Sequence, residues 1–167
     1  LLNNALRIYR ELGEVSNEDI EYANRGYVEV SRSLIGILSN RELGYELRAS
    51  SSINLLEELE DNEEAELSGE LRVLLEQIAE ERLDIAEQEA EGLEEIFEEL
   101  NRAKDIYSYL GESNKVEDIN EVIREQLDMY RSNLGRIGDS QIEIAGGLYL
   151  LGMYLESDGI EEARELY

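Results

Sequence analysis

The sequence contains no proline, histidine, cysteine, tryptophan or threonine. Without cysteine the chain can form neither disulfides nor a thiolate nucleophile. Without histidine it lacks the commonest general base, and with both missing it lacks the usual ligands of structural zinc. The absence of proline leaves helices uninterrupted, because proline removes a backbone donor and clashes with the preceding turn. Most side chains that carry chemistry are therefore missing, and we expect no catalytic, cofactor-binding or metal-binding residues.

Positive charge is also scarce. Fifteen lysines and arginines face 41 aspartates and glutamates, which gives a net charge of −26. A field of this sign repels phosphate groups, so it argues against nucleic acid and anionic membrane surfaces as partners. The longest apolar run, Ile142–Leu155, is interrupted by Glu143 and is shorter than the about 20 residues of a membrane span. No signal peptide is visible, so we expect a soluble protein whose compartment the sequence does not indicate.

Helical periodicity covers nearly the whole chain, and no stretch alternates between polar and apolar residues as a strand would. From Ser16 onward, for example, Ile20, Ala23, Tyr27, Val30, Leu34 and Leu38 recur at steps of three or four and form one apolar stripe. The sequence therefore predicts a single all-α domain over 1–167, with seven to eight antiparallel helices stacked as hairpins. The expected helices cover 2–12, Ser16 to Leu38, Arg41 to Asp61, the stretch 63–111, Asn114 to Gly135, Gln141–Glu156 and Ile160–Tyr167.

Two local signals set the expected boundaries. Ser39 with Glu42 matches a capping box, which predicts a helix start near Arg41. A single helix over 63–111 would be roughly 70 Å long, too long for a compact domain of this size. The apolar rhythm falters at Glu80–Arg82, so we expect a break at 80–84 and a second one near Asn101.

The chain also resembles itself. The pattern Ile8-Tyr9 followed by Leu12-Gly13 recurs as Ile106-Tyr107 followed by Leu110-Gly111. Glu18-Asp19-Ile20 recurs later in the chain as Glu117-Asp118-Ile119. The pattern Ala-x-x-x-Tyr starts at Ala5, Ala103 and Ala163. Repetition of this kind is typical of stacked helical hairpins.

Residues 150–167, with Tyr154, Ile160, Ala163 and Tyr167, resemble a tetratricopeptide repeat. In that family a small residue of the second helix packs on the first, and an aromatic residue follows four positions later. Ala5 and Tyr9, running into Leu12-Gly13, are similar to the second helix of such a unit. The resemblance implies antiparallel helix pairs and, by analogy, a concave face that binds a peptide.

Tyrosine and arginine are the residues that could anchor a peptide, since both are common at the centres of interfaces. An alternative is that the ten tyrosines replace Phe and Trp at the edge of the core, with the hydroxyl reaching water. The candidate peptide-binding residues lie in the least acidic third of the chain and are Tyr22, Arg25, Tyr27, Arg32, Tyr45 and Arg48.

Carboxylates are the one abundant chemical group. Glu156, Asp158, Glu161 and Glu162 surround Gly159, but the spacing of an EF-hand is not met. The pairs Glu63-Glu64 and Glu98-Glu99 could hold a divalent ion loosely, although solvated helix faces rich in glutamate explain them as well. We therefore expect no metal and no cofactor.

Four hypotheses for the role of the protein follow. The restricted set of residue types favours a designed, non-catalytic helical scaffold. A tetratricopeptide-like module that binds a peptide or protein is the alternative. Heavy acidity with little lysine would also suit a halophile protein, and paired carboxylates would suit a glycosidase. Because both chain ends lie inside helical patterns, self-association through the helical ends is a further expectation.

Overall fold

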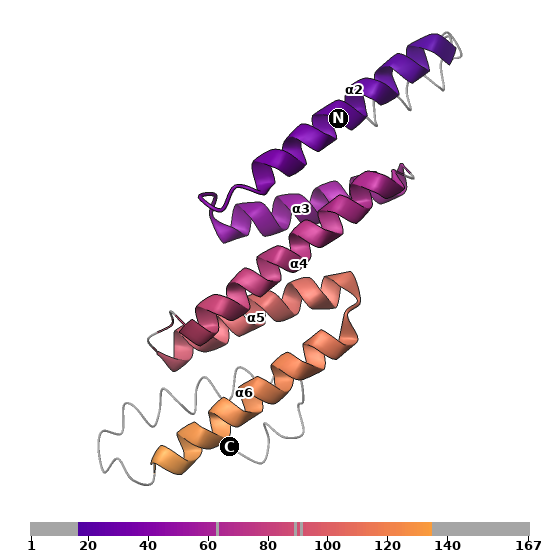
Figure 1. Ribbon diagram of the computed structural model, residues 1–167. Helices are drawn as coiled ribbons and strands as arrows, with labels where there is room; N and C mark the ends of the chain where they lie inside the picture. The colour runs from indigo at the N-terminus through magenta and orange to yellow at the C-terminus, as the bar shows by residue number, and fades with distance from the viewer. Residues whose placement is uncertain (1–16, 63, 89, 91, 135–167) are drawn as a thin grey trace. The chain divides into compact units, whose positions relative to one another are not determined.

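A computed structural model describes residues 17–62, 64–88, 90 and 92–134 (Figure 1). Every regular element within these ranges is an α-helix, so the all-α prediction is confirmed. The helices expected over 2–12, 141–156 and 160–167 lie outside the described residues, and the total of seven to eight stays a prediction. The described helices are α2 (Asn17–Leu38), α3 (Tyr45–Asp61), α4 (Ala65–Gln88), α5 (Leu93–Leu110) and α6 (Ser113–Leu134).

Long and short helices alternate along the chain. The long helices α2, α4 and α6 have 22, 24 and 22 residues, whereas the short helices α3 and α5 have 17 and 18. The long helices begin at positions 17, 65 and 113 and the short ones at positions 45 and 93, so both kinds recur at the same interval. We call this interval, from position 17 to position 65 for example, the repeat period. One long and one short helix thus form the repeating unit of the described chain.

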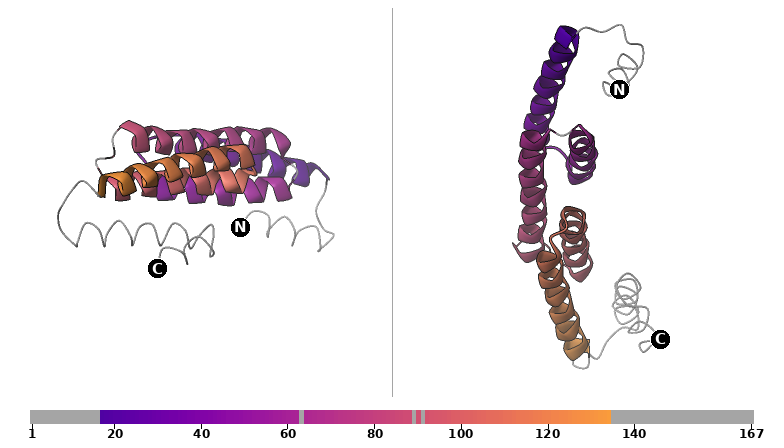
Figure 2. Two further views of the ribbon diagram at one scale, coloured as in Figure 1. Left: turned by 90° about the horizontal axis from the view of Figure 1, so that it is seen from below. Right: turned by 90° about the vertical axis from the view of Figure 1, so that its right-hand side faces the viewer.

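The chain forms two compact units, residues 1–81 and 82–167, and the boundary lies inside α4. In the first unit α2 packs against α3, which lies beside the first part of α4 (Figure 2). In the second unit α5 packs against α6.

The core of the first unit comes from one face of each helix. Burial of one leucine or isoleucine side chain contributes about 1.5–3 kcal/mol to the free energy of folding. This is more than the intrinsic helix propensity of a residue contributes. The buried apolar residues that the structure describes in this unit are Tyr27, Ile35 and Leu38 of α2, Ala49, Leu55, Leu56 and Leu59 of α3, and Leu67, Leu71, Leu74, Leu75, Ile78 and Ala79 of α4.

The core of the second unit centres on α5. Ala103 and Tyr107, one of the Ala-x-x-x-Tyr pairs of the sequence, are both buried. The ammonium of Lys115 lies 5.8 Å from the centroid of the Tyr107 ring, which is within the range of a cation–π contact. The other buried apolar residues in the described part of this unit are Ala86, Phe97, Leu100, Ile106, Ile119 and Ile123.

The predicted capping box at Ser39 is wrong. The Ser39 hydroxyl donates to the carbonyl oxygen of Ile35 at 2.8 Å, so it completes the last turn of α2 instead of starting the next helix. Asn40 Oδ1 accepts from the backbone N–H of Glu42 at 3.0 Å and closes a turn. The next helix starts at Tyr45 after Gly44, with no side-chain cap.

Both breaks predicted within 63–111 are also wrong. Helix α4 continues through 80–84 to Gln88, and α5 continues through Asn101 to Leu110. The break lies between these helices, next to Gly92. The apolar rhythm falters at 80–82 because Glu81 and Arg82 form ion pairs with neighbouring helices, not because the helix ends there.

One of the expected helix ends was right, and a second end had not been predicted. Helix α3 ends at Asp61, the last residue of the helix expected from the sequence, and Asn62 is its C-cap. Gly111, which repeats Gly13 in the sequence, caps α5 in the left-handed conformation with φ 79°. Glycine adopts this conformation without the steric penalty of a Cβ atom.

Candidate functional site

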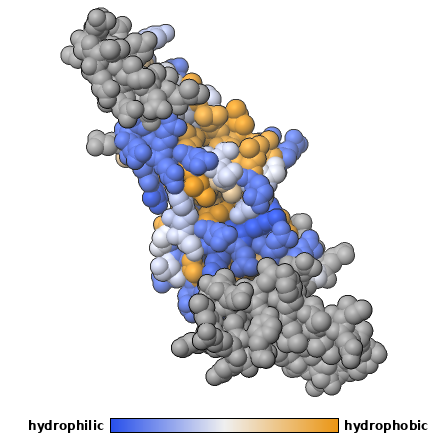
Figure 3. All heavy atoms as spheres, turned by 180° about the vertical axis from the view of Figure 1, so that it is seen from behind, coloured by the Kyte–Doolittle hydropathy of each residue, from blue (hydrophilic) through white to orange (hydrophobic). Residues whose placement is uncertain are grey.

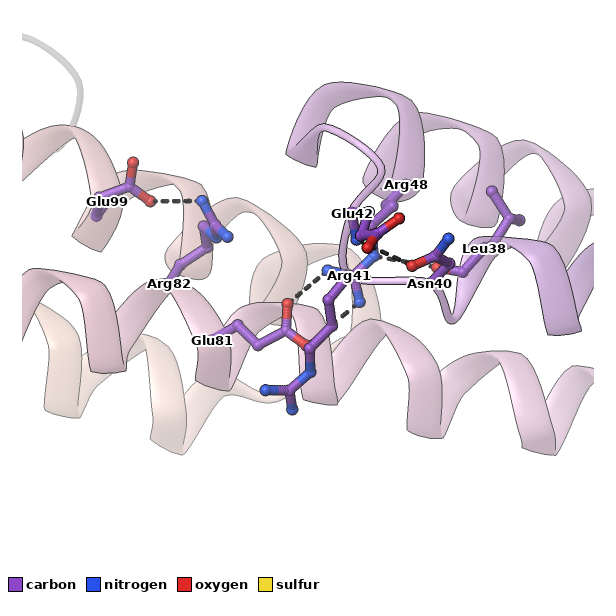
Figure 4. Close-up of polar contacts among 8 residues, drawn as sticks. All are labelled: Leu38, Asn40, Arg41, Glu42, Arg48, Glu81, Arg82 and Glu99. Atoms are coloured by element: carbon purple, nitrogen blue, oxygen red, sulfur yellow. Dashed lines mark hydrogen bonds and ion pairs between the residues drawn. The ribbon is translucent and has the colours of Figure 1, made fainter.

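Among the described residues of the first unit, Arg48 on α3 is the most deeply buried charged residue. It lies on the same face of that helix as Ser52 and Leu55, so the helix itself carries it into the core. Its side chain is 3% exposed, and Nε donates to the carbonyl oxygen of Leu38 at 3.0 Å. Nη1 and Nη2 contact the two carboxylate oxygens of Glu81 at 2.5 and 3.3 Å (Figure 4). This bidentate geometry satisfies most of the guanidinium at once.

Glu81 forms ion pairs with two arginines. Besides Arg48, its Oε1 lies 3.0 Å from Nε of Arg41, whose own side chain is 78% exposed. One carboxylate thus sits between a buried and a solvated guanidinium. Arginine stays protonated in proteins, so neither guanidinium can act as a base or nucleophile. The arrangement joins α3, α4 and the connection 39–44.

A second arrangement of the same kind lies in the other unit. Glu99 of α5 is buried and accepts from Arg82 Nη1 at 3.2 Å. Its other oxygen contacts Arg102 Nη1, while Arg102 Nη2 reaches Glu98 at 2.6 Å. The pair Glu98-Glu99, considered above as a loose cation site, is therefore engaged by arginine.

Tyr27 is a structural residue at the edge of the core. It is 7% exposed, its hydroxyl donates to the carbonyl oxygen of Glu58 at 3.4 Å, and Asn62 Nδ2 donates to it at 3.5 Å. Burial raises the pKa of Tyr27 above 10.0, the charge of Glu58 raises it further, and hydrogen bonds from Ser31 and Asn62 partly offset both. Tyr27 thus matches the alternative reading of the tyrosines as fillers of the core edge.

No protein-family model matches the chain. No curated protein and no solved structure shows significant similarity to it either. What the protein does is therefore argued from its own residues.

The six candidate peptide-binding residues do not form one surface. Tyr27 and Arg48 are buried, so a peptide could not contact them while the unit stays folded. Tyr22 is 78% exposed, and Tyr45 is half-buried at the start of α3. Arg25 donates to the carbonyl of Glu21 on its own helix, and Arg32 pairs with Glu66 at 3.6 Å.

A different surface on α2 was not predicted. Val30 and Leu34 belong to the apolar stripe found in the sequence, yet they are 59% and 41% exposed, and Ile37 is 57% exposed. We call these three residues the α2 stripe. Figure 3 shows hydrophobic side chains gathered over the part of the chain that holds α2 and α3. The three- and four-residue spacing was the available signal, but spacing alone does not show which apolar residues a neighbour covers.

Two searches of the described ranges concern metals and membranes. Within them, no three or more acidic side chains come together in a way that could hold a metal ion. The carboxylates around Gly159 lie outside these ranges. None of the helices described between residues 17 and 134 has both the length and the apolar content needed to cross a membrane.

Proposed function

We propose that the protein is a non-catalytic scaffold built from a repeating helical hairpin. The observation that carries this proposal is the alternation of long and short helices with a constant repeat period. In repeat proteins each unit contacts its neighbours, and the stacked units supply a framework instead of an enclosed reaction site.

The use of charge supports the proposal. Both buried charged residues in the described part of the chain, Arg48 and Glu99, are engaged in ion pairs between helices. Buried carboxylates and arginines in an active site would have to keep an atom available for a substrate. Here the contacts join one helix to the next.

We further propose that the sequence was designed for this fold. Five residue types are missing, including threonine, which has no reason to be excluded from helix caps and loops. Strong helix formers, above all glutamate, occupy many exposed positions, such as Glu70, Glu76 and Glu80 of α4.

A tetratricopeptide-like interaction module is the second candidate. The alternation of helical hairpins and the burial of Ala103 with Tyr107 favour it. The repeat period of this chain is longer than the roughly 34 residues typical of that family. In this reading the ligand would be a peptide, bound through residues other than Tyr27 and Arg48.

Insertion of one more repeat tests the scaffold. The segment 65–112 forms one repeat period, so a second copy of it placed between residues 112 and 113 should add a hairpin. We expect mean helicity per residue to stay unchanged and the melting temperature, followed by circular dichroism, to stay equal or rise. The matched control carries the same segment in scrambled order and should lose helicity and cooperativity. Loss of the cooperative melt with the correct repeat would contradict the proposal.

A thermal melt in dilute buffer and in molar salt separates the scaffold from a halophile protein. A designed scaffold should stay helical at high temperature in dilute buffer, where the repulsion among 26 net negative charges is strongest. A chain that folds only when salt is added would support the halophile origin instead.

A further inference from the structure

We draw no further inference here: the strongest candidate, the α2 stripe of Val30, Leu34 and Ile37, is an exposed apolar face for which nothing in the described part of the structure shows what covers it.

Discussion

Glu81 and Arg82 are consecutive residues of α4 that form ion pairs with different helices, Glu81 with Arg48 of α3 and Arg82 with Glu99 of α5. The long helix supplies the acid in one pair and the base in the other. The two short helices therefore carry opposite charges at their contacts with α4. Exchanging α3 and α5 would place Glu99 beside Glu81 and Arg48 beside Arg82. The two ion pairs therefore disfavour the exchanged arrangement.

Removing one partner of the ion pair of Arg48 with Glu81 should destabilise the protein, because the other charge stays buried. Glu81→Gln leaves the guanidinium of Arg48, which is 3% exposed, without its anion. We expect a loss of about 3 kcal/mol in the free energy of unfolding, measured with urea. Glu80→Gln changes an exposed neighbour and should stay within about 0.5 kcal/mol of the parent. Equal losses in the free energy of unfolding for the two variants would show that the ion pair of Arg48 with Glu81 does not stabilise the fold.

Replacing both partners should cost less than replacing one. In Arg48→Met combined with Glu81→Met, no unpaired charge is left in the core, and apolar replacements of buried ion pairs are often neutral or stabilising. We expect the double variant to be more stable than either single variant in the same urea titration. Additive losses would mean that the two residues act independently.

The sequence predicted the elements better than the contacts between them. The end of α3 at Asp61 follows from local chemistry, which the sequence shows directly. The ion pairs of Glu81 and Arg82 were misread as a helix break, because a polar residue inside an apolar pattern looks the same whether it ends a helix or pairs across it.

The candidate surface was missed for a related reason. Periodicity placed Val30 and Leu34 in one stripe with Tyr27, but burial depends on which neighbours arrive and from which side. Arg48 was proposed as a ligand anchor because arginine and tyrosine are common at the centres of interfaces. The structure gives it a partner 33 positions along the chain, and no local pattern contains that information.

Ser52 should be replaceable with a gain in stability. Its hydroxyl is fully buried in α3 and has no hydrogen-bond partner among the described residues. A buried unsatisfied hydroxyl costs about 1–3 kcal/mol, so Ser52→Ala should stabilise by about 1 kcal/mol in chemical unfolding. Ser50→Ala is the control for helix propensity, since the Ser50 hydroxyl is exposed and donates to the carbonyl of Glu46. A gain no larger than that of the control would contradict the prediction.

Asp105 should make the stability of the second unit depend on pH. The residue as a whole is exposed, but burial of part of its carboxyl raises its pKa above 3.8, and the charge of Lys104 offsets this only in part. A raised pKa in the folded state means that stability falls as pH rises from 3.8 through the folded value. Asp105→Asn should therefore raise the melting temperature at pH 7, and the gain should disappear below pH 3.8.

The control for Asp105 removes the same charge elsewhere. Asp118→Asn lies on an exposed position of α6 and changes the net charge equally. The gain at pH 7 should be larger for Asp105→Asn than for this control. An equal gain would assign the effect to the overall charge of the protein instead of to the desolvated carboxyl.

Two glycine-to-alanine changes should have opposite effects, although an added Cβ atom meets no atom within 4 Å at either site. Gly69 lies inside α4, where alanine is favoured by about 0.5–1 kcal/mol because glycine loses more backbone entropy on folding. Gly111 has φ 79°, and the left-handed conformation costs other residues about 1–2 kcal/mol. We therefore expect Gly69→Ala to raise and Gly111→Ala to lower the midpoint of urea unfolding. If both changes stabilised the protein, α5 would not end in a left-handed turn at Gly111, and the connection to α6 would have another geometry.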